Sequence, residues 1–260
     1  MIELSITNHV AEIVLNAPWK LNSLDEAGLG ELSEAYDHAA VGVAAGSVRA
    51  LLLRGEGRAF CAGRDIAEVD GANDDARHYL ETLLTPLLQK MSNFPAPTFA
   101  AAQGACLGVG LGLLVATDVV YVAENAKFGS PFANLGATLD SGGHWLFTER
   151  LGAARTLDLI YTAELISGAE AVTSGMFSRT KPAGELLDFT RAAAVKAATG
   201  PTQAFNASKS LVGAIRDLRL GLWDAVVLEN AAQIELSETA DYAEGFAAFA
   251  GKRKPDFKGR

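Results

Sequence analysis

Cysteine and histidine are scarce in this chain of 260 residues, which has two cysteines and four histidines. Two cysteines are too few for a disulfide framework, and Cys61 and Cys106 lack the spacing of a metal site. The histidines are scattered and form no ligand cluster; they are His9, His38, His78 and His144. The sequence therefore predicts no metal centre, and each cysteine is expected to be a small packed residue.

Positive charge is also in short supply. The chain has 22 Lys and Arg against 31 Asp and Glu, a formal net charge of −9. Such a balance argues against nucleic acid or an anionic membrane as the main partner. The C-terminal tail is the exception, with Lys252, Arg253, Lys254, Lys258 and Arg260 against Asp256. Two interpretations stay open for it: a solvated terminus, or a contact with an anionic ligand.

The chain lacks a long uninterrupted apolar run. Its longest apolar stretch, around residues 107–122, is broken by glycines and by Asp118, so it predicts no membrane span. The first six residues resemble a strand rather than a signal peptide. We therefore expect a cytoplasmic protein. Its 49% apolar and 20% charged residues are typical of a globular protein with one large domain.

Glycine, by contrast, is concentrated in two turns. Residues 103–112 read Q-G-A-C-L-G-V-G-L-G, and residues 58–66 read R-A-F-C-A-G-R-D-I. Glycine is used where the chain turns tightly or where backbone N–H groups approach a ligand closely. Two such turns could direct two amides at one ligand oxygen. A dinucleotide cradle is disfavoured, because 104–112 has no G-x-G-x-x-G and no acidic residue ends a following strand at the expected distance.

The remaining pattern predicts an α/β fold. Strands are expected at 1–6, 10–15, 48–53, 98–102, 118–122 and 127–128, the first two as a hairpin. Helices are expected after Asp25 as N-cap, at 74–91, 108–117, 144–163, 168–175 after a capping box, 185–199, 202–217 and 222–250. The recurrence of strand, glycine turn and helix predicts a sheet built by crossovers. The helical end is expected to cap the domain or to pack against a neighbouring subunit.

Several blocks in order resemble the crotonase (enoyl-CoA hydratase/isomerase) superfamily from residue 2 to residue 257. They are the loop 17–24 (A-P-W-K-L-N-S-L), the turns 58–66 and 103–110, the segments 128–136 and 166–175, and the tail 251–257 (G-K-R-K-P-D-F). The resemblance implies a crotonase-type spiral of β-β-α repeats (1–195), with a helical C-terminal trimerisation region (196–260). It also implies an acyl-CoA thioester substrate, a homotrimer or dimer of trimers, and no separate cofactor, since coenzyme A is part of the substrate.

The resemblance further implies that the backbone N–H groups of Arg64 and Val109 bind the thioester oxygen. Removing a proton beside a thioester places negative charge on that oxygen, and one preorganised amide donor is worth about 3 kcal/mol to such a charge. A helix beginning near Gly110 would add its N-terminal dipole. These two donors form the predicted oxyanion hole.

The chain departs from the hydratases of this superfamily at two positions. Where they hold water with two glutamates, it has Gly112 and Phe132, and neither residue can move a proton. Asp140, in the run D-S-G-G-x-W, is the available carboxylate. By spacing alone, it serves equally well as a helix N-cap. The run is similar to that of the ring-epoxide phenylacetyl-CoA isomerases, and this likeness implies Asp140 as the acid/base of an isomerase.

Three other functions stay open: a hydratase, a dehalogenase or hydrolase in which Asp140 is the nucleophile, and a catalytically silent acyl-CoA-binding subunit. An apolar lining would raise the pKa of Asp140; the candidates for that lining are Phe132, Leu139 and Trp145. Together with Phe147 they favour a hydrophobic acyl group. His144, one helical turn from Asp140, is not placed in the site.

The resemblance also implies a set of substrate and coenzyme A contacts. They are Lys20, Leu21, Ala62, Asp65, Ile66, Gly110, Phe132, Phe249 and Lys252, the last two reaching coenzyme A late in the chain, in some members from a neighbouring subunit. Arg64 is unusual at its position, which more often holds a small residue. Its side chain is expected to point to solvent or to the phosphates.

Overall fold

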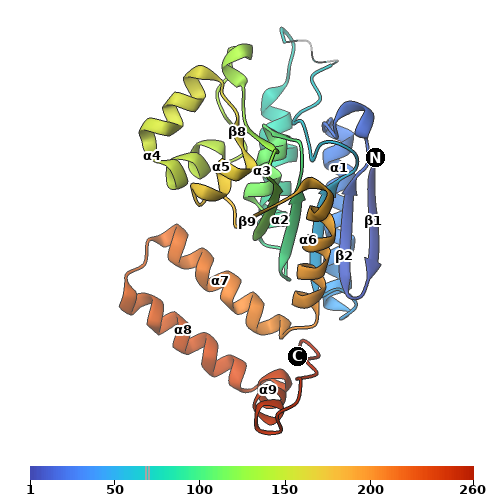
Figure 1. Ribbon diagram of the computed structural model, residues 1–260, viewed down its shortest axis with the longest axis vertical. Helices are drawn as coiled ribbons and strands as arrows, with labels where there is room; N and C mark the ends of the chain where they lie inside the picture. The colour runs from blue at the N-terminus through green and yellow to red at the C-terminus, as the bar shows by residue number, and fades with distance from the viewer. Residues whose placement is uncertain (68, 70) are drawn as a thin grey trace.

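Two β-sheets organise the molecule in the computed structural model, which describes residues 1–67, 69 and 71–260 (Figure 1). The larger sheet has the strand order β1-β2-β3-β4-β6-β9, and the smaller one β5-β7-β8. Their bounds are β1 Ile2–Thr7, β2 Val10–Leu15, β3 Ala50–Gly55, β4 Thr98–Ala102, β5 Ala105–Leu107, β6 Val119–Ala123, β7 Lys127–Gly129, β8 Ile166–Ser167 and β9 Arg179–Lys181.

The predicted hairpin and crossovers are confirmed. Strands β1 and β2 pair antiparallel from Ile2 opposite Leu15 to Thr7 opposite Val10. Asn8 and His9 both take positive φ, 51° and 61°, as a tight turn between twisted strands requires. The next four pairs of the large sheet are all parallel, and parallel neighbours need crossover connections.

Helices occupy most of the rest. They are α1 Glu26–Ala44, α2 Thr85–Ser92, α3 Val109–Val115, α4 Gly143–Thr162, α5 Gly168–Thr173, α6 Ala183–Ala198, α7 Thr202–Leu218, α8 Leu222–Ser237 and α9 Ala240–Ala250, with the 3₁₀ helices η1 Pro18–Lys20 and η3 Phe132–Leu135 and the π-helix η2 His78–Leu84. Asp25 caps α1, its side chain accepting from the Gly28 N–H at 2.7 Å. Ser167 caps α5, while the Glu170 carboxylate accepts from Arg155 instead of completing the capping box.

Three expectations about secondary structure were wrong, and three short strands were missed. The predicted helix 222–250 is two helices, because Thr239 accepts from the Tyr242 N–H and starts α9. Helix α4 is interrupted at Gly152, whose φ is 77°. The predicted helix 74–91 begins later and is a π-helix over η2. Strands β5, β8 and β9 were missed; runs of two or three residues carry too little alternation to be read from sequence.

The core lies between the large sheet and the helices packed on it. Helix α6 packs across β3, β4 and β6, while α1 packs against β1 and α2. The predicted core face of α1 is buried; it consists of Leu29, Leu32, Tyr36 and Ala39. Figure 1 shows α7, α8 and α9 extending away from this layer, at the lower end of the molecule. The division at residues 195 and 196 stays a prediction, and α6 runs across it.

The C-terminal tail is tied down rather than free. The Arg49 guanidinium donates to the carbonyl oxygens of Gly200 (2.5 Å) and Phe257 (2.9 Å). The buried Asp241 carboxylate accepts from the tail amides of Lys258 (2.6 Å) and Gly259 (2.7 Å). Two of the tail's own cations are paired: Arg253 with Glu244, and Lys258 with Asp256. The tail is nevertheless exposed over most of residues 251–260, so the interpretation as a solvated terminus and that as a contact with an anionic ligand both stay open.

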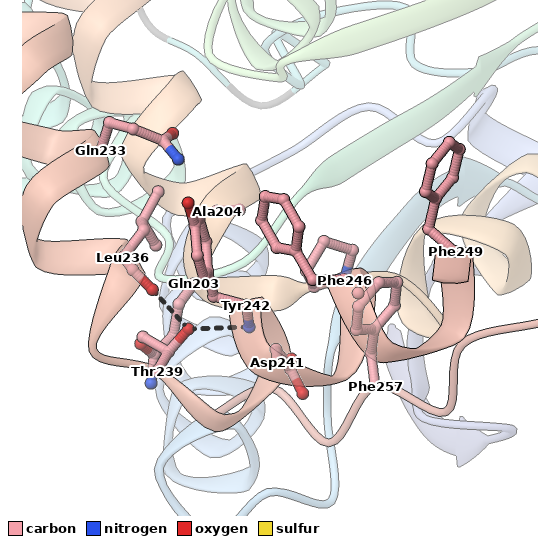
Figure 2. Close-up of a pocket in the computed structure, with 12 residues that line it drawn as sticks. Gln203, Ala204, Gln233, Leu236, Thr239, Asp241, Tyr242, Phe246, Phe249 and Phe257 are labelled. Carbon is pink, nitrogen blue, oxygen red and sulfur yellow. Dashed lines mark hydrogen bonds between the residues drawn. The ribbon is translucent and has the colours of Figure 1, made fainter. Parts of the chain in front are cut away.

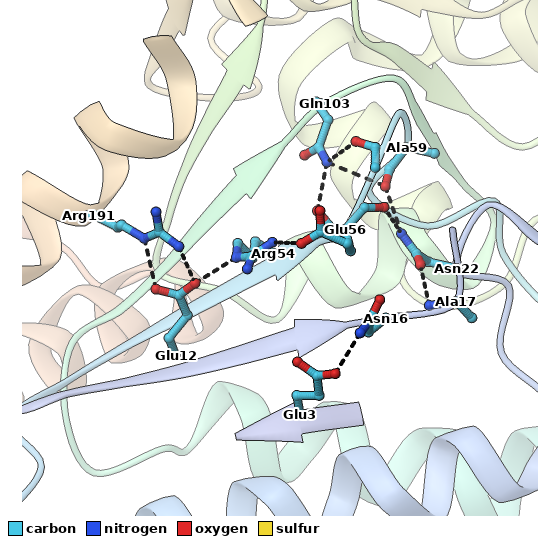
Figure 3. A network of polar contacts seen from close by, with 12 residues as sticks. Glu3, Glu12, Asn16, Ala17, Asn22, Arg54, Glu56, Ala59, Gln103 and Arg191 are labelled. Atoms are coloured by element: carbon cyan, nitrogen blue, oxygen red, sulfur yellow. Dashed lines mark hydrogen bonds and ion pairs between the residues drawn. The ribbon is translucent and has the colours of Figure 1, made fainter. Parts of the chain in front are cut away.

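A network of charged side chains ties α6 to the large sheet (Figure 3). The Glu12 carboxylate of β2 accepts from Arg54 Nε of β3 at 2.6 Å and from two nitrogens of Arg191 at 2.7 and 2.9 Å. Burial raises the pKa of Glu12, but the hydrogen bonds from Arg191 and Arg54 outweigh it, so the pKa is lowered. Glu12 therefore stabilises the fold in its ionised form.

We expect Glu12→Ala to lower the free energy of unfolding by about 2 kcal/mol at pH 7, because both guanidinium groups lose their shared acceptor. Since the folded pKa lies below the unfolded value, this contribution is present above pH 4.5 and is lost as the pH falls. Urea denaturation at pH 7 and pH 3 measures it. Glu3→Ala is the control, since the exposed Glu3 accepts a hydrogen bond from Asn16 and pairs with no cation among the described residues. An equal loss at both pH values would contradict the assignment.

Two negative findings apply to the described residues alone. Within residues 1–67, 69 and 71–260, no helix is long and apolar enough to cross a membrane. In the same part of the chain, no three His, Cys, Asp or Glu side chains are grouped so that they could hold a metal ion.

Candidate active site

The two glycine turns are hydrogen-bonded to each other along their backbones. The Cys61 N–H donates to the Ala105 carbonyl at 3.0 Å, and the Leu107 N–H donates to the Cys61 carbonyl at 3.0 Å. Cys61 and Cys106 pair as an isolated parallel β-bridge through their backbones. Both are free cysteines and fully buried. The approach requires glycine, because a Cβ on Gly110 would lie 2.3 Å from the Cys61 carbonyl oxygen. The prediction that the two turns come together is confirmed.

The backbone amides without an acceptor among the described residues include Arg64 N on the first turn and Val109 N on the second. The two amides follow glycines with positive φ, Gly63 at 105° and Gly108 at 50°. A Cβ on Gly63 would lie 3.7 Å from Val109 N, so the turns are in van der Waals contact at this point. Unpaired N–H groups seek an acceptor. The pair can bind an oxygen atom that carries negative charge.

Asp140 lies between η3 and α4, and it is not the helix cap. The N-cap of α4 is Gly142, which makes no side-chain cap bond, and only the backbone carbonyl of Asp140 accepts from Gly143 N–H. The Asp140 carboxylate instead accepts from the Ser141 hydroxyl at 2.6 Å. The interpretation of the Asp140 side chain as a helix N-cap is therefore wrong.

The Asp140–Ser141 turn rests on α3 at Gly112. A Cβ at Gly112 would lie 2.4 Å from Ser141 Cβ and 2.9 Å from the Ser141 carbonyl oxygen. Val109 and Gly112 are three residues apart in α3, so they share one face and are separated by about 5 Å along the axis. The turn that carries Asp140 therefore sits about one helical turn from the Val109 amide. It also fills the space that a side chain at Gly112 would need.

The environment of Asp140 favours its protonated form. Burial raises the pKa of the carboxyl, and this outweighs the Ser141 hydrogen bond and the charges of Arg64 and His144, which lower it. A carboxylate with a raised pKa takes up a proton more readily and is a better base near neutral pH. The expected direction of the shift is confirmed.

The expected apolar lining of Asp140 stays a prediction. The Phe132 ring lies against the second glycine turn, since a Cβ on Gly108 would be 3.0 Å from Phe132 Cζ. Leu139 and Phe147 are buried. Trp145 is 39% exposed, and its ring lies 5.0 Å from the Arg216 guanidinium of α7. The Trp145 ring therefore packs against the Arg216 side chain.

The Arg64 side chain is held within the chain, so the expectation that it points to solvent or to phosphates is wrong. Its guanidinium donates two hydrogen bonds to Asp74, at 2.6 and 2.8 Å, and lies 4.1 Å from the Tyr79 ring centroid. The Tyr79 hydroxyl donates to the Leu24 carbonyl at 3.0 Å. The Asp74 and Tyr79 side chains thus brace the turn that carries the Arg64 amide.

Ser141, Asp74 and Tyr79 are the site residues that sequence reasoning missed. Ser141 stands next to Asp140 in the D-S-G-G run, and this adjacency was the only available signal for it. Asp74 and Tyr79 belong to a segment read as one amphipathic helix, in which a buried tyrosine stacked on an arginine cannot be recognised from spacing.

The early loop and the first glycine turn lie side by side, as the coenzyme A assignment requires. Lys20 Nζ donates to Asp65 at 2.9 Å and to Asp25 at 3.1 Å. The Leu21 carbonyl accepts from the Ala62 N–H at 2.9 Å. Ile66 follows this turn and is 52% exposed. The structure brings these residues together, and their role in binding coenzyme A stays a prediction.

Phe249 and Lys252 are not brought to this site within one chain. Figure 1 shows α9 at the lower end of the molecule, away from α3. Phe249 is 86% exposed and borders a separate apolar cavity of about 480 Å³ between α7, α8, α9 and the tail (Figure 2). That cavity is remote from the unpaired amides and from Asp140, so we assign it no catalytic role. A contact from a neighbouring chain stays a prediction for both residues.

Comparison with known proteins gives a consistent picture. The family model described as enoyl-CoA hydratase/isomerase matches residues 5–260. A protein of Rhodobacter capsulatus named as a probable enoyl-CoA hydratase is 38% identical, over 100% of this chain and 98% of its own length. The 1,2-epoxyphenylacetyl-CoA isomerase of Escherichia coli is 32% identical, over 96% of this chain and 95% of its own.

Solved structures agree. The crystal structure of an enoyl-CoA hydratase from Bacillus anthracis superposes with a TM-score of 0.89 at 29% identity, covering 100% of this chain and 99% of that one. The predicted α/β crotonase fold is therefore confirmed. With two glycine turns bonded together and a family model that matches nearly the whole chain, the protein belongs to the enoyl-CoA hydratase/isomerase family.

Proposed function

We propose that this protein is an acyl-CoA isomerase, which shifts a double bond or rearranges a ring, with Asp140 as the acid/base. One observation carries the proposal. The Asp140 carboxyl, with its raised pKa, stands on a turn that packs onto α3 about one helical turn from the unpaired Val109 amide. The same turn fills the space where a second carboxylate, on a side chain at Gly112, would stand. A single carboxylate is sufficient for isomerisation.

The reaction follows from these groups. The thioester carbonyl accepts from the N–H groups of Arg64 and Val109, which stabilise negative charge on its oxygen. Asp140 removes a proton from the carbon beside the carbonyl or from its vinylogous position, and the electron pair moves into the conjugated enolate. The protonated Asp140 then returns the proton to a different carbon, and the double bond is shifted. No water and no second acid are consumed.

Binding is proposed to follow the family pattern. Coenzyme A, as part of the substrate, lies against Lys20, Leu21, Ala62, Asp65 and Ile66. The acyl end enters between Gly110 and Phe132. A neighbouring subunit supplies Phe249 and Lys252, so the active protein is a homotrimer or a dimer of trimers. We place the enzyme in the cytoplasm, in fatty acid or related acyl-CoA metabolism, without a separate cofactor, nucleic acid or membrane partner.

Hydration is the second candidate, and the names of relatives favour it, since the Rhodobacter capsulatus relative is named as a hydratase. The residues at 112 and 132 argue against it, because neither glycine nor phenylalanine can activate water. Nucleophilic attack by Asp140 in a dehalogenase or hydrolase, and a silent acyl-CoA binder, are the remaining alternatives. Each predicts a different outcome across a panel of acyl-CoA substrates.

The test is deuterium uptake from solvent into a 3-enoyl-CoA, followed by mass spectrometry across a panel of acyl chains. We expect exchange together with the conjugated 2-enoyl product. Because burial raises the pKa of Asp140, the basic form is lost as the pH falls through a value above the usual 3.8, so kcat/KM should decline on the acid side from there. Formation of a 3-hydroxyacyl-CoA from a 2-enoyl-CoA with no double-bond shift in a 3-enoyl-CoA, a trapped enzyme ester, or binding without turnover would each overturn the proposal.

A further inference from the structure

Ser141 occupies an unusual backbone conformation beside the proposed acid/base. Its φ is 55°, in the left-handed region that favours glycine, and the next residue, Gly142, has a φ of 85°. A serine persists in such a conformation when its surroundings determine it, and such strain is concentrated at functional sites. Here the surroundings are known: the Ser141 backbone and Cβ rest on Gly112, and its hydroxyl donates to Asp140 Oδ1 at 2.6 Å.

We propose that Ser141 is a positioning residue, seated on Gly112, that holds one oxygen of Asp140 and leaves the other oxygen to carry the proton. The proposal rests on the isomerase function above and adds the residue that orients the base. A carboxylate that shuttles a proton between two carbons must keep one oxygen directed at both. A single strong hydrogen bond to the opposite oxygen achieves this, since bonds to a charged acceptor are short and directional.

The contact of Ser141 with Gly112 fixes the position of the turn that carries Asp140. Helix α3 is buried along residues 109–114, so Gly112 offers a fixed surface one helical turn from Val109. Ser141 meets this surface through its Cβ and its carbonyl oxygen, and a shift of the turn toward α3 is blocked. The Ser141 hydroxyl is then held at one place relative to the Val109 amide. Glycine at 112 and serine at 141 thus work as a pair.

Three other titratable groups, on three different elements, interact with Asp140, and none replaces the hydroxyl. Arg64 on the first glycine turn and His144 on α4 lower the pKa of Asp140 through their charge, and Tyr79 on η2 interacts with it electrostatically. Arg64 is already bonded to Asp74, and His144 lies 3.4 Å from Thr138 Oγ1. Among the described residues, only the Ser141 hydroxyl is a side-chain donor to the Asp140 carboxylate.

The test is Ser141→Gly, because glycine adopts the same φ without strain and removes only the Cβ and the hydroxyl. The carboxyl titration of Asp140 is followed by ¹³C NMR in the ligand-free protein. We expect its midpoint to rise by about one pH unit, since a hydrogen bond that stabilises the ionised form is lost. The acid limb of kcat/KM should move by the same amount, with kcat reduced more than KM is raised. Ser141→Cys, which keeps a weak donor, should restore part of the shift.

Ser167→Ala is the matched control, because it removes a serine hydroxyl that caps α5 through the Glu170 N–H. It should lower the melting temperature without moving either titration. An unmoved Asp140 midpoint in Ser141→Gly would overturn the positioning role. The NMR titration needs no substrate, so its outcome is separate from the proposed function. If the wild-type protein shows no exchange with any acyl-CoA yet the midpoint moves, the isomerase proposal fails and the hydrogen bond stands.

Discussion

Asp140→Asn should lower the rate of isomerisation and of solvent deuterium exchange by about 10²–10⁴-fold, the usual contribution of a positioned acid/base. Asparagine keeps the shape of aspartate, and its amide oxygen can still accept from the Ser141 hydroxyl. The Arg64 and Val109 amides are untouched, so acyl-CoA binding should stay within about twofold of wild type. Single-turnover kinetics and isothermal titration calorimetry with a 3-enoyl-CoA measure the two quantities.

The same substitution should leave the fold as stable as before, or more stable. The folded pKa of Asp140 is raised, so its contribution to stability is present below the unfolded pKa and is lost as the pH rises through the folded value. At pH 7 the ionised carboxylate therefore destabilises the folded state, and replacing it with a neutral amide removes this destabilisation. Asp188→Asn, on an exposed side chain of α6, is the control for loss of a charge. Turnover by Asp140→Asn within tenfold of wild type would remove Asp140 from the mechanism.

Gly112→Ala should reduce kcat by more than about tenfold and the free energy of unfolding by about 1–3 kcal/mol, as overpacking does. The new methyl group would lie 2.4 Å from Ser141 Cβ and 2.9 Å from the Ser141 carbonyl oxygen, so the Asp140–Ser141 turn must move. The sign of the stability change is informative. Alanine is the better helix former by about 1 kcal/mol and would otherwise stabilise α3.

Gly30→Ala is the matched control for this substitution. Gly30 is an exposed residue within α1, and a Cβ there would meet no atom within 4 Å. We expect it to raise the free energy of unfolding by about 1 kcal/mol without changing kcat. Gly112→Glu should not create hydratase activity, because the added carboxylate has no room beside Ser141. A stabilised and fully active Gly112→Ala protein would show that the Asp140–Ser141 turn does not depend on its contact with Gly112.

The sequence foretold the parts of the site that depend on local backbone chemistry. The glycine turns, the Asp25 cap and the hairpin before β3 each follow from residues close together in the chain. The parts that it did not foretell depend on contacts between distant segments. Ser141 meets Gly112 across 29 residues of sequence, and the Arg64 guanidinium stacks on a tyrosine of the π-helix η2. Such contacts arise when the fold closes, and no local pattern encodes them.

The reactivity of the two buried cysteines reports whether the two glycine turns separate. The two glycine turns pair through the backbones of Cys61 and Cys106. Burial raises the pKa of the Cys61 thiol to about 12. Thiol reagents attack the thiolate, so in the closed state neither cysteine should react. Labelling becomes possible only when the turns separate. The rate of alkylation in native buffer therefore measures how often the two turns of the proposed oxyanion hole separate, and an acyl-CoA bound across both turns should slow it.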